Sequence, residues 1–258
     1  VESLKQQVYS NPALGEVAFL FANAGMSRAA SGSVIEPSME DWERTFAVNV
    51  YGVVHCLKSF VPAMQAQRTD CAVVTTSSYA GLLNASPGGF GSDVCYTASK
   101  HAVTIITEAL AHELRLQPRN QVSVHCLFPA GVKTNFLRNS EAAMFQGVDE
   151  GPERARREEG IAKSRNVPLI TRKGLTPDEL VQVLYDGMKE GKFYIRAYDH
   201  ENNFDVLGAV IMERVLSVRP PSAVSSRPET SSSSGSRSPW STRSALAAKR
   251  QHHHHSKL

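Results

Sequence analysis

The chain has 258 residues, of which 41% are hydrophobic and 21% charged, with a formal net charge of +3. This composition is ordinary for a soluble protein and supports one substantial hydrophobic core. No apolar stretch reaches the roughly 20 residues that a membrane-spanning helix needs. The four cysteines form neither a CxxC pair nor a secreted disulfide framework, which indicates a reducing compartment.

The first half of the chain predicts a strand followed by one long helix. Residues 17–21 form a short apolar run typical of a buried strand. From Met39 to Met64, apolar residues recur at spacings of three and four, and Ser38 with Asp41 can cap the start of this helix. Pro62 can kink it near its end.

Strands and helices then alternate. Residues 71–78 read as a buried strand because they are short and rich in β-branched side chains, and residues 96–115 read as a helix with apolar residues at helical spacing. A strand over 121–128, a helix from Thr176 to Gly191 and a last strand over 193–197 follow. This alternation predicts parallel strands joined by crossover connections.

Two further segments depart from this alternation. Residues 134–171 are polar and charged with poor periodicity, and the charged run 154–159 is compatible with a solvated surface helix. Residues 207–216 read as a terminal packing helix. Beyond them, residues 217–258 hold 13 serines and seven Lys or Arg against the single Glu229, so we predict a disordered tail.

The tail carries one targeting signal. Ser256-Lys257-Leu258 matches the tripeptide that the peroxisomal import receptor reads, so a peroxisomal location is expected, with the cytoplasm as the alternative. The basic tail has little aromatic interleaving, so nucleic-acid or anionic-lipid binding is not expected. The four histidines at 252–255 are better explained by low complexity than by a metal site.

Tyr96 and Lys100 form the most informative pair in the chain. Residues four apart lie on one face of a helix, so the phenol and the ammonium can act on the same volume. A free tyrosine has a pKa of about 10, which is about 3 units above the pH at which it would have to act as a base. A neighbouring cation can lower this pKa. Because Tyr185 and Lys189 repeat the spacing elsewhere, the surroundings must distinguish the two copies.

The surroundings favour the first copy. Ser77 and Ser78 lie at the carboxyl end of a predicted strand, where ligands bind in open α/β sheets. The following helix carries Tyr96 and Lys100 in its first turns. The hydroxyls, the phenol and the ammonium can therefore converge on one site.

Four segments together resemble the short-chain dehydrogenase/reductase family over residues 16–216. Residues 21–25 are similar to its Asn-Asn-Ala-Gly turn, with Ala22 in place of the first Asn, and residues 129–134 to its Pro-Gly segment, with Ala130 in place of Gly. The helix asparagine and the Ser-Tyr-Lys set complete the match. The implied catalytic residues are Asn49, Ser78, Tyr96 and Lys100, and the implied cofactor-binding residues are Asn23, Gly25, Tyr96, Lys100, Pro129, Val132 and Thr134.

The resemblance implies an oxidoreductase that moves a hydride between NAD or NADP and an alcohol or carbonyl substrate. Tyr96 would act as the acid or base, and Lys100 would stabilise its phenolate and bind the nicotinamide ribose. Ser78 would hydrogen-bond the substrate oxygen, and Asn49 would hold a water that links Lys100 to solvent. The family fold is a Rossmann-like, doubly wound parallel α/β sheet, usually in a homo-oligomer.

The remaining implied contacts concern the cofactor. Val132 and Thr134 would fix the carboxamide side of the nicotinamide, in the segment that Pro129 begins. Asn23 and Gly25 would border the adenosine half. No metal site is expected.

One part of the family pattern is absent: the glycines form no Gly-x-x-x-Gly-x-Gly or Gly-x-Gly-x-x-Gly turn for the pyrophosphate. After a short helix over residues 2–9 the chain enters what resembles the family's fourth strand. We therefore expect an incomplete chain without the first three strands, with a truly truncated protein as the second choice. The loop over 84–93 is longer than is usual in the family. The resemblance also implies a mobile lid over the substrate in residues 134–171, with a solvated surface helix as an equal alternative for the run 154–159.

Two domain and function assignments follow. We predict a catalytic portion over residues 1–216 and a disordered tail over 217–258. The alternative function is a truncated, non-catalytic binding or dimerisation module. Each residue also has a structural alternative: Ser78 as a cap at the strand end, Asn49 as a satisfied helix residue and Thr134 as the N-cap of the next helix.

Overall fold

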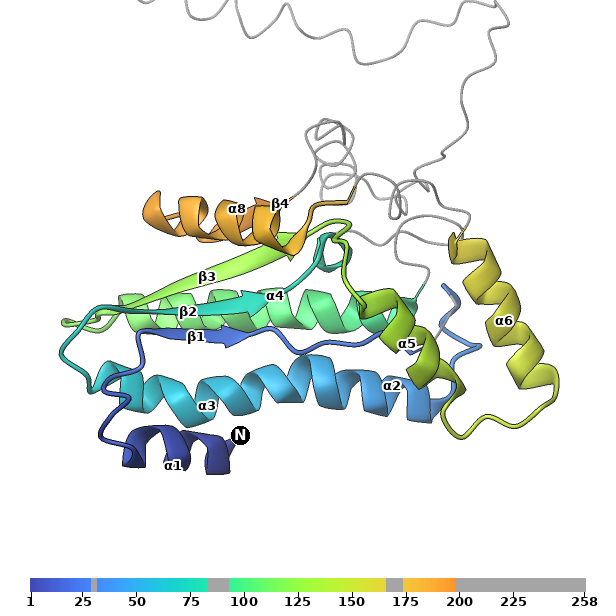
Figure 1. The fold of residues 1–258 in the computed structure, drawn as a ribbon, viewed down its shortest axis with the longest axis horizontal. Helices are drawn as coiled ribbons and strands as arrows, with labels where there is room; N and C mark the ends of the chain where they lie inside the picture. The colour runs from blue at the N-terminus through green and yellow to red at the C-terminus, as the bar shows by residue number, and fades with distance from the viewer. Residues whose placement is uncertain (29–31, 83–92, 166–173, 198–258) are drawn as a thin grey trace, which may run out of the picture. The chain divides into compact units, whose positions relative to one another are not determined.

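The computed structural model describes residues 1–28, 32–82, 93–165 and 174–197 (Figure 1). The chain divides into two units, Val1–Ser225 and Ser226–Leu258, and the whole second unit lies outside the described residues. The predicted domain boundary at residue 216, the predicted helix over 207–216, the tail and the long loop over 84–92 also lie outside them. The structure therefore does not test these predictions.

Four parallel strands form one sheet in the order β1-β2-β3-β4. Phe19 pairs with Ala72 and Cys71 with Val122, so neighbouring strands are in contact from their first residues. Consecutive parallel strands need a crossover connection, as predicted. The parallel α/β sheet is confirmed, and each strand lies within two residues of its predicted position. The strands are β1 (Phe19–Ala22), β2 (Cys71–Thr76), β3 (Val122–Pro129) and β4 (Tyr194–Ala197).

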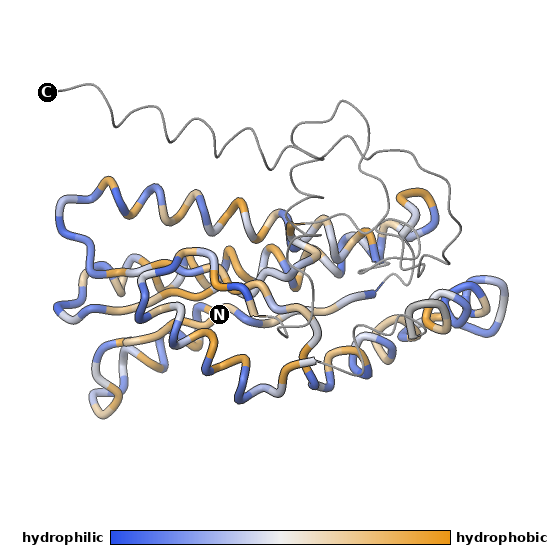
Figure 2. The backbone as a smooth tube through the Cα atoms, turned by 90° about the horizontal axis from the view of Figure 1, so that it is seen from above, coloured by the Kyte–Doolittle hydropathy of each residue, from blue (hydrophilic) through white to orange (hydrophobic). Residues whose placement is uncertain are grey.

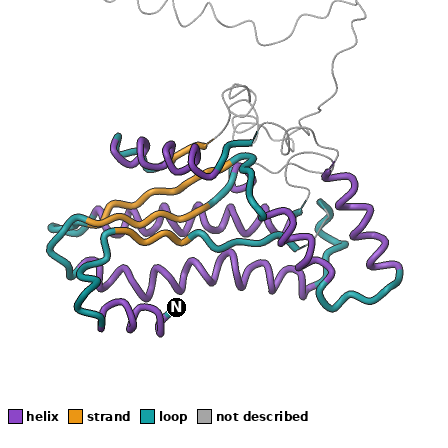
Figure 3. Tube along the Cα trace, viewed as in Figure 1, coloured by secondary structure: helices purple, strands orange, loops and turns teal. Residues whose placement is uncertain are grey.

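Helices occupy the crossovers and the region beyond the strand ends (Figure 3). The helix that leads into the first strand, predicted over residues 2–9, is confirmed. The described helical segments are α1 (Glu2–Ser10), α2 (Met39–Phe46), η1 (Ala47–Tyr51), α3 (Gly52–Gln65), η2 (Tyr79–Gly81), α4 (Val94–Arg115), α5 (Phe136–Phe145), α6 (Pro152–Arg165) and α8 (Pro177–Lys189).

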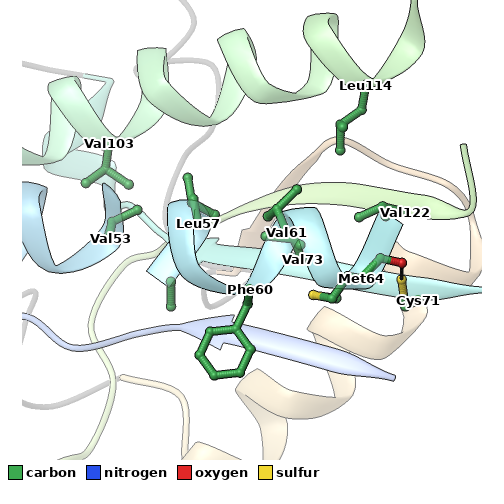
Figure 4. Close-up of a cluster of buried hydrophobic side chains, with 11 residues drawn as sticks. Val53, Leu57, Phe60, Val61, Met64, Cys71, Val73, Val103, Leu114 and Val122 are labelled. Carbon is green, nitrogen blue, oxygen red and sulfur yellow. Dashed lines mark hydrogen bonds between the residues drawn. The ribbon is translucent and has the colours of Figure 1, made fainter. Parts of the chain in front are cut away.

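The sheet is covered on both faces. Helices α3 and α4 pack on one face and α8 on the other (Figure 1). Val73 belongs to the first cluster and Val74 to the second, because successive strand residues point to opposite faces. Figure 4 shows the first cluster, in which Leu57, Phe60 and Met64 of α3 lie against the sheet. This double coverage explains why β2 is almost wholly apolar or β-branched.

Helices α2, η1 and α3 form one continuous run from Met39 to Gln65. The predicted capping box is present, because Ser38 Oγ accepts from the Asp41 N–H and the Asp41 carboxylate accepts from the Ser38 N–H. The departure from α-helical geometry is the π-helical turn at Ala47–Tyr51. By length and composition alone this helix could cross a membrane, a test that core helices of soluble proteins also pass.

Helix α8 begins and ends as its sequence predicts. Thr176 and Glu179 form a second capping box, Pro177 follows at the first helical position, and Gly191 adopts a φ of 68° just after the helix. Figure 2 shows that hydrophilic and hydrophobic residues alternate along the helical turns.

Helices α5 and α6 lie beyond the carboxyl ends of β1, β2 and β3 (Figure 1). They occupy part of the segment for which sequence periodicity was poor. The charged run 154–159 is helical, but it is not entirely solvated, since Arg157 is only 6% exposed. The interpretation of this run as a fully solvated surface helix is therefore wrong for Arg157.

Candidate active site

The carboxyl ends of three neighbouring strands bring the predicted site residues together. The loop after β1 carries Asn23 and Gly25, β2 leads directly into Ser78, and β3 leads into the segment that contains Val132 and Thr134. Because the strands are parallel and adjacent, these segments emerge at one edge of the sheet. Helix α4 adds Tyr96 and Lys100 from above this edge.

Ser78 and Tyr96 are in contact through their side chains. Ser78 is extended, with φ −171° and ψ 165°, and its Oγ accepts a hydrogen bond from Ala80 N at 3.1 Å, so it caps the short η2 turn. The same side chain lies close enough to the Tyr96 phenol to act on its pKa. The structural alternative for Ser78 is therefore real, but it does not prevent the hydroxyl from meeting the phenol.

Burial raises the pKa of Tyr96 to about 12, while the hydrogen bond from Ser78 acts to lower it and the charge of Asp93 to raise it. This shift is opposite to the one that a neighbouring cation produces. The reason is the desolvation of the phenolate, which exceeds the favourable interactions. The expected lowering of the phenol pKa is therefore not seen, and the Tyr96 phenol is protonated at neutral pH.

Lys100 is 2% exposed, and its Nζ donates to the Thr76 carbonyl oxygen at 2.8 Å. Its Nζ also lies 5.6 Å from the centroid of the Tyr96 ring. Burial lowers the pKa of the ammonium to about 8. An ammonium has three donors and the described residues provide this one acceptor, so Lys100 can donate to a further ligand.

Asn49 is fully buried in the π-helical turn η1. Its Oδ1 accepts from Met26 N at 2.8 Å, and its Nδ2 donates to Met26 O and to Ser99 Oγ, both at 2.9 Å. The side chain thus ties the loop after β1 to helix α4. The alternative that Asn49 is a satisfied helix residue holds for its side chain, and the predicted water position is not tested.

Gly25 approaches these groups closely. A Cβ at this position would lie 3.2 Å from Lys100 Nζ and 3.6 Å from Asn49 Oδ1, so a side chain here would crowd the ammonium. Asn23 is exposed at the sheet edge, and its Oδ1 accepts from Thr76 Oγ1 at 2.9 Å. The loop therefore leaves backbone and polar atoms open beside Lys100, as a nucleotide-binding edge requires.

The segment after β3 is held by backbone pairing. Val132 forms a bridge with Leu175, and Thr134 N donates to Val132 O at 2.9 Å. Pro129 is the last residue of β3 and starts this turn. Thr134 is exposed, and its Oγ1 accepts from Phe136 N at 3.2 Å, so the hydroxyl serves the first turn of α5. The N-cap residue of α5 is Asn135, which makes no side-chain cap hydrogen bond, so Thr134 is not the N-cap residue that was predicted.

Two supporting residues, Asp93 and Ser99, were not identified from the sequence, and Ser77 was expected only as a hydroxyl at the strand end. Asp93 is 5% exposed, and its Oδ1 accepts from Tyr96 N at 3.0 Å at the start of α4. Ser77 Oγ donates to Lys100 O at 3.0 Å, and Ser99 Oγ donates to Tyr96 O at 2.7 Å. The sequence does carry a signal for Asp93, because it directly precedes helix α4 and aspartate is a preferred N-cap residue.

The second tyrosine-lysine pair lies elsewhere. Tyr185 is 51% exposed on α8, and Lys189 is exposed at the end of the same helix. Neither lies at the strand ends. The two pairs share their spacing, but among the described residues the first pair has a serine hydroxyl that acts on the phenol pKa and a buried ammonium, whereas the second pair is exposed.

The chain is similar in sequence to known dehydrogenases. The sequence profile of the family described as short chain dehydrogenase matches residues 2–144. The meso-2,3-butanediol dehydrogenase of Serratia marcescens is 35% identical over 135 residues, 52% of this chain and 48% of its own length. The secoisolariciresinol dehydrogenase of Forsythia intermedia is 37% identical over 120 residues, 46% of this chain and 40% of its own length.

Solved structures agree with the fold. A short chain dehydrogenase/reductase from Burkholderia phymatum in complex with NAD is 28% identical, with a TM-score of 0.68, and the match covers 86% of this chain and 73% of that one. The chain spans about half or less of the length of the two dehydrogenases named above. The profile match covers more than half of the chain and includes every candidate site residue. The chain therefore belongs to the short-chain dehydrogenase family.

Proposed function

We propose that this chain carries the proton-transfer site of an NAD- or NADP-dependent oxidoreductase that acts on an alcohol or carbonyl substrate, with Tyr96 as the acid or base. The observation that carries the proposal is the proximity of three side chains: the Ser78 hydroxyl lies close enough to the Tyr96 phenol to act on its pKa, and the buried Lys100 ammonium lies 5.6 Å from the centroid of the same ring. Family membership and the dehydrogenase relatives support the reaction class.

The side chains suit reduction of a carbonyl in the state described. The Tyr96 phenol, with its pKa raised to about 12, holds the proton that it would donate to the substrate oxygen. Ser78 would donate a hydrogen bond to that oxygen as negative charge develops there. Lys100 would stabilise the phenolate that remains. The nicotinamide, when bound, supplies or takes the hydride.

The described residues fit a nicotinamide nucleotide at the strand ends. Lys100 has donors left for ribose hydroxyls, and Gly25 keeps the space beside its Nζ free of a side chain. Asn23, in the loop after β1, and Thr134, in the segment after β3, are both exposed. Pro129 and Val132 belong to the same segment as Thr134. The assays below use both NAD and NADP.

The test compares two matched substitutions in the native, full-length protein. Tyr96→Phe removes the proton donor but keeps the ring, and Tyr185→Phe makes the same change in the exposed pair. Initial rates are measured with acetoin and NADH or NADPH, and with meso-2,3-butanediol and NAD or NADP. We expect Tyr96→Phe to lose about 10²- to 10⁴-fold in kcat, as for loss of a general acid, and Tyr185→Phe to keep the native rate.

Nicotinamide binding is measured in parallel by NADH and NADPH fluorescence titration. We expect Tyr96→Phe to bind the nucleotide nearly as tightly as the native protein. Native turnover in Tyr96→Phe would show that the proposed role of Tyr96 is wrong. A folded native protein that binds neither nucleotide would favour the non-catalytic binding module over the oxidoreductase.

The peroxisomal location and the homo-oligomer remain proposals. Residues 256–258 lie outside the described residues, so the proposed address rests on the sequence Ser-Lys-Leu alone. A fluorescent protein fused in front of residues 217–258 is expected to enter peroxisomes, and the same fusion with Lys257→Glu to stay in the cytoplasm. Equal cytoplasmic signal from both fusions would argue against the address.

A further inference from the structure

Two arginines and one aspartate are buried together outside the set of reacting side chains. Arg28 is 2%, Asp41 1% and Arg157 6% exposed. Arg28 Nε donates to Asp41 Oδ1 at 3.1 Å, and Arg157 Nη2 donates to Asp41 Oδ2 at 2.8 Å. The three residues come from the loop after β1, helix α2 and helix α6. We call them the arginine clasp.

The clasp holds the carboxyl end of helix α5. Arg28 donates to the carbonyl oxygens of Ala143 and Gln146, and Arg157 donates to that of Met144 at 2.7 Å. The last carbonyls of a helix lack partners inside the helix and form its negative end. Two guanidinium groups therefore satisfy the end of α5 with hydrogen bonds and with complementary charge.

The same loop joins α5 to the start of the catalytic helix. Ser27 N donates to Ser140 Oγ of α5 at 3.2 Å, while Ser27 Oγ and Arg28 N donate to Asp93 Oδ2. Asp93 caps α4 through Tyr96 N. One short stretch thus contacts both α5 and the N-terminus of α4.

Helix α5 begins directly over the proposed acid. The ring of Phe136, its first residue, lies 5.7 Å from the ring of Tyr96. The clasp fixes the far end of the same helix. The position of Phe136 over Tyr96 is therefore set from both ends of α5.

We propose that the arginine clasp holds α5 and α6 as a lid over Tyr96, and that Arg157 is a positioning residue for substrate binding. The lid role rests on the proposed function. The contacts by which the clasp holds α5 and α6 do not depend on it. Nothing in the clasp touches the reacting groups, so its effect passes through the placement of α5. Loss of Arg157 is expected to weaken substrate binding more than it slows the chemical step.

Arg157 is the clasp residue whose removal leaves its charged partners paired, while the Met144 carbonyl oxygen loses its donor. Asp41 keeps Arg28, and its Oδ2 still accepts from Ser38 N at 3.2 Å and Ser38 Oγ at 2.9 Å. Glu153 is 43% exposed and keeps its ion pair with Arg156. Arg157→Met therefore does not strand a buried charge, which is the usual reason that breaking a buried pair unfolds a protein.

The experiment measures amide hydrogen exchange in residues 136–162 of the full-length protein. We compare native protein, Arg157→Met, Arg157→Lys and a control, Arg138→Gln, which changes an exposed arginine on α5. We expect exchange in 136–162 to become about tenfold faster in Arg157→Met, with unchanged exchange in β2 and β3. Arg157→Lys should restore part of the protection, and Arg138→Gln should match the native protein.

Kinetics with meso-2,3-butanediol and NAD separate positioning from bulk stability. We expect the KM for the alcohol to rise about tenfold in Arg157→Met with kcat within about threefold, the pattern of lost uniform binding. Native exchange in Arg157→Met would overturn the clasp, and an unchanged KM despite faster exchange would overturn the positioning role. If the folded native protein binds neither nucleotide and turns over no alcohol, the proposed function fails, and the exchange result still decides whether the clasp holds the two helices.

Discussion

Replacing Lys100 with methionine is expected to stabilise the fold while it removes the activity. Lys100 is 2% exposed, and burial lowers the pKa of its ammonium from 10.5 to about 8. The charged form is thus held in the folded protein against a desolvation cost. Functional groups of this kind commonly reduce stability.

The size of the effect follows from the pKa. Lowering the pKa of Lys100 from 10.5 to about 8 corresponds to about 3 kcal/mol against the ammonium, which is still mostly charged at pH 7. The hydrogen bond from Nζ to Thr76 O is lost in the variant, at a cost of about 1 kcal/mol. Methionine fills a similar volume without a charge. The free energy of unfolding should therefore rise by about 2 kcal/mol at pH 7.

The pH dependence has a defined sign. Between pH 8 and 10.5 the unfolded chain binds more protons at Lys100 than the folded protein does, so the native protein becomes more stable as pH rises through this window. Lys100→Met lacks this titration. Its advantage should fall from about 2 kcal/mol at pH 7 to about zero or below near pH 10.

Urea unfolding at pH 7 and pH 10 measures both effects. Native protein, Lys100→Met and the exposed control Lys189→Met are compared without nucleotide, and equal m-values are required. The control should lie within about 0.5 kcal/mol of the native protein at both pH values. A Lys100→Met protein less stable than the native one at pH 7, or one whose advantage is the same at both pH values, refutes the reasoning.

Three further substitutions test the packing by urea unfolding. Gly52→Ala should stabilise by about 0.5–1 kcal/mol, because the added Cβ meets nothing closer than the Ala47 carbonyl oxygen at 3.8 Å. Gly187→Ala should destabilise by about 1–3 kcal/mol, because its Cβ would lie 2.8 Å from Ile195 Cγ1. Thr176→Ala should cost about 1 kcal/mol through loss of the α8 cap. The two glycine changes are expected to shift the free energy of unfolding in opposite directions, so one general effect of Gly→Ala would not reproduce both results.

Local patterns in the sequence were sufficient for the strands, the caps and the spacing of Tyr96 and Lys100. Each of these depends on residues within one or two turns of each other. The capping boxes at Ser38 and Thr176 are read directly from the chain, and both form. The β-branched run of β2 likewise required no knowledge of its neighbours.

Contacts between distant segments were not predictable in the same way. Arg157 and Asp41 are 116 residues apart, and nothing in the run 154–159 distinguishes the buried Arg157 from the partly buried Arg154 and Arg156. Met26 binds Asn49 through its backbone, so the identity of the side chain carries no signal. The raised pKa of Tyr96 depends on burial by tertiary packing, and helical spacing alone gave the opposite direction.

Transfer of a labelled hydride tests the central claim most directly. The native full-length protein and Tyr96→Phe are incubated with acetoin and each of the two stereoisomers of NADH deuterated at C4, and the alcohol product is analysed by mass spectrometry. We predict deuterium in the product of the native protein with one stereoisomer, and almost none from Tyr96→Phe. Equal incorporation by the two proteins, or none by a native protein that is folded and binds NADH, would contradict the proposed site.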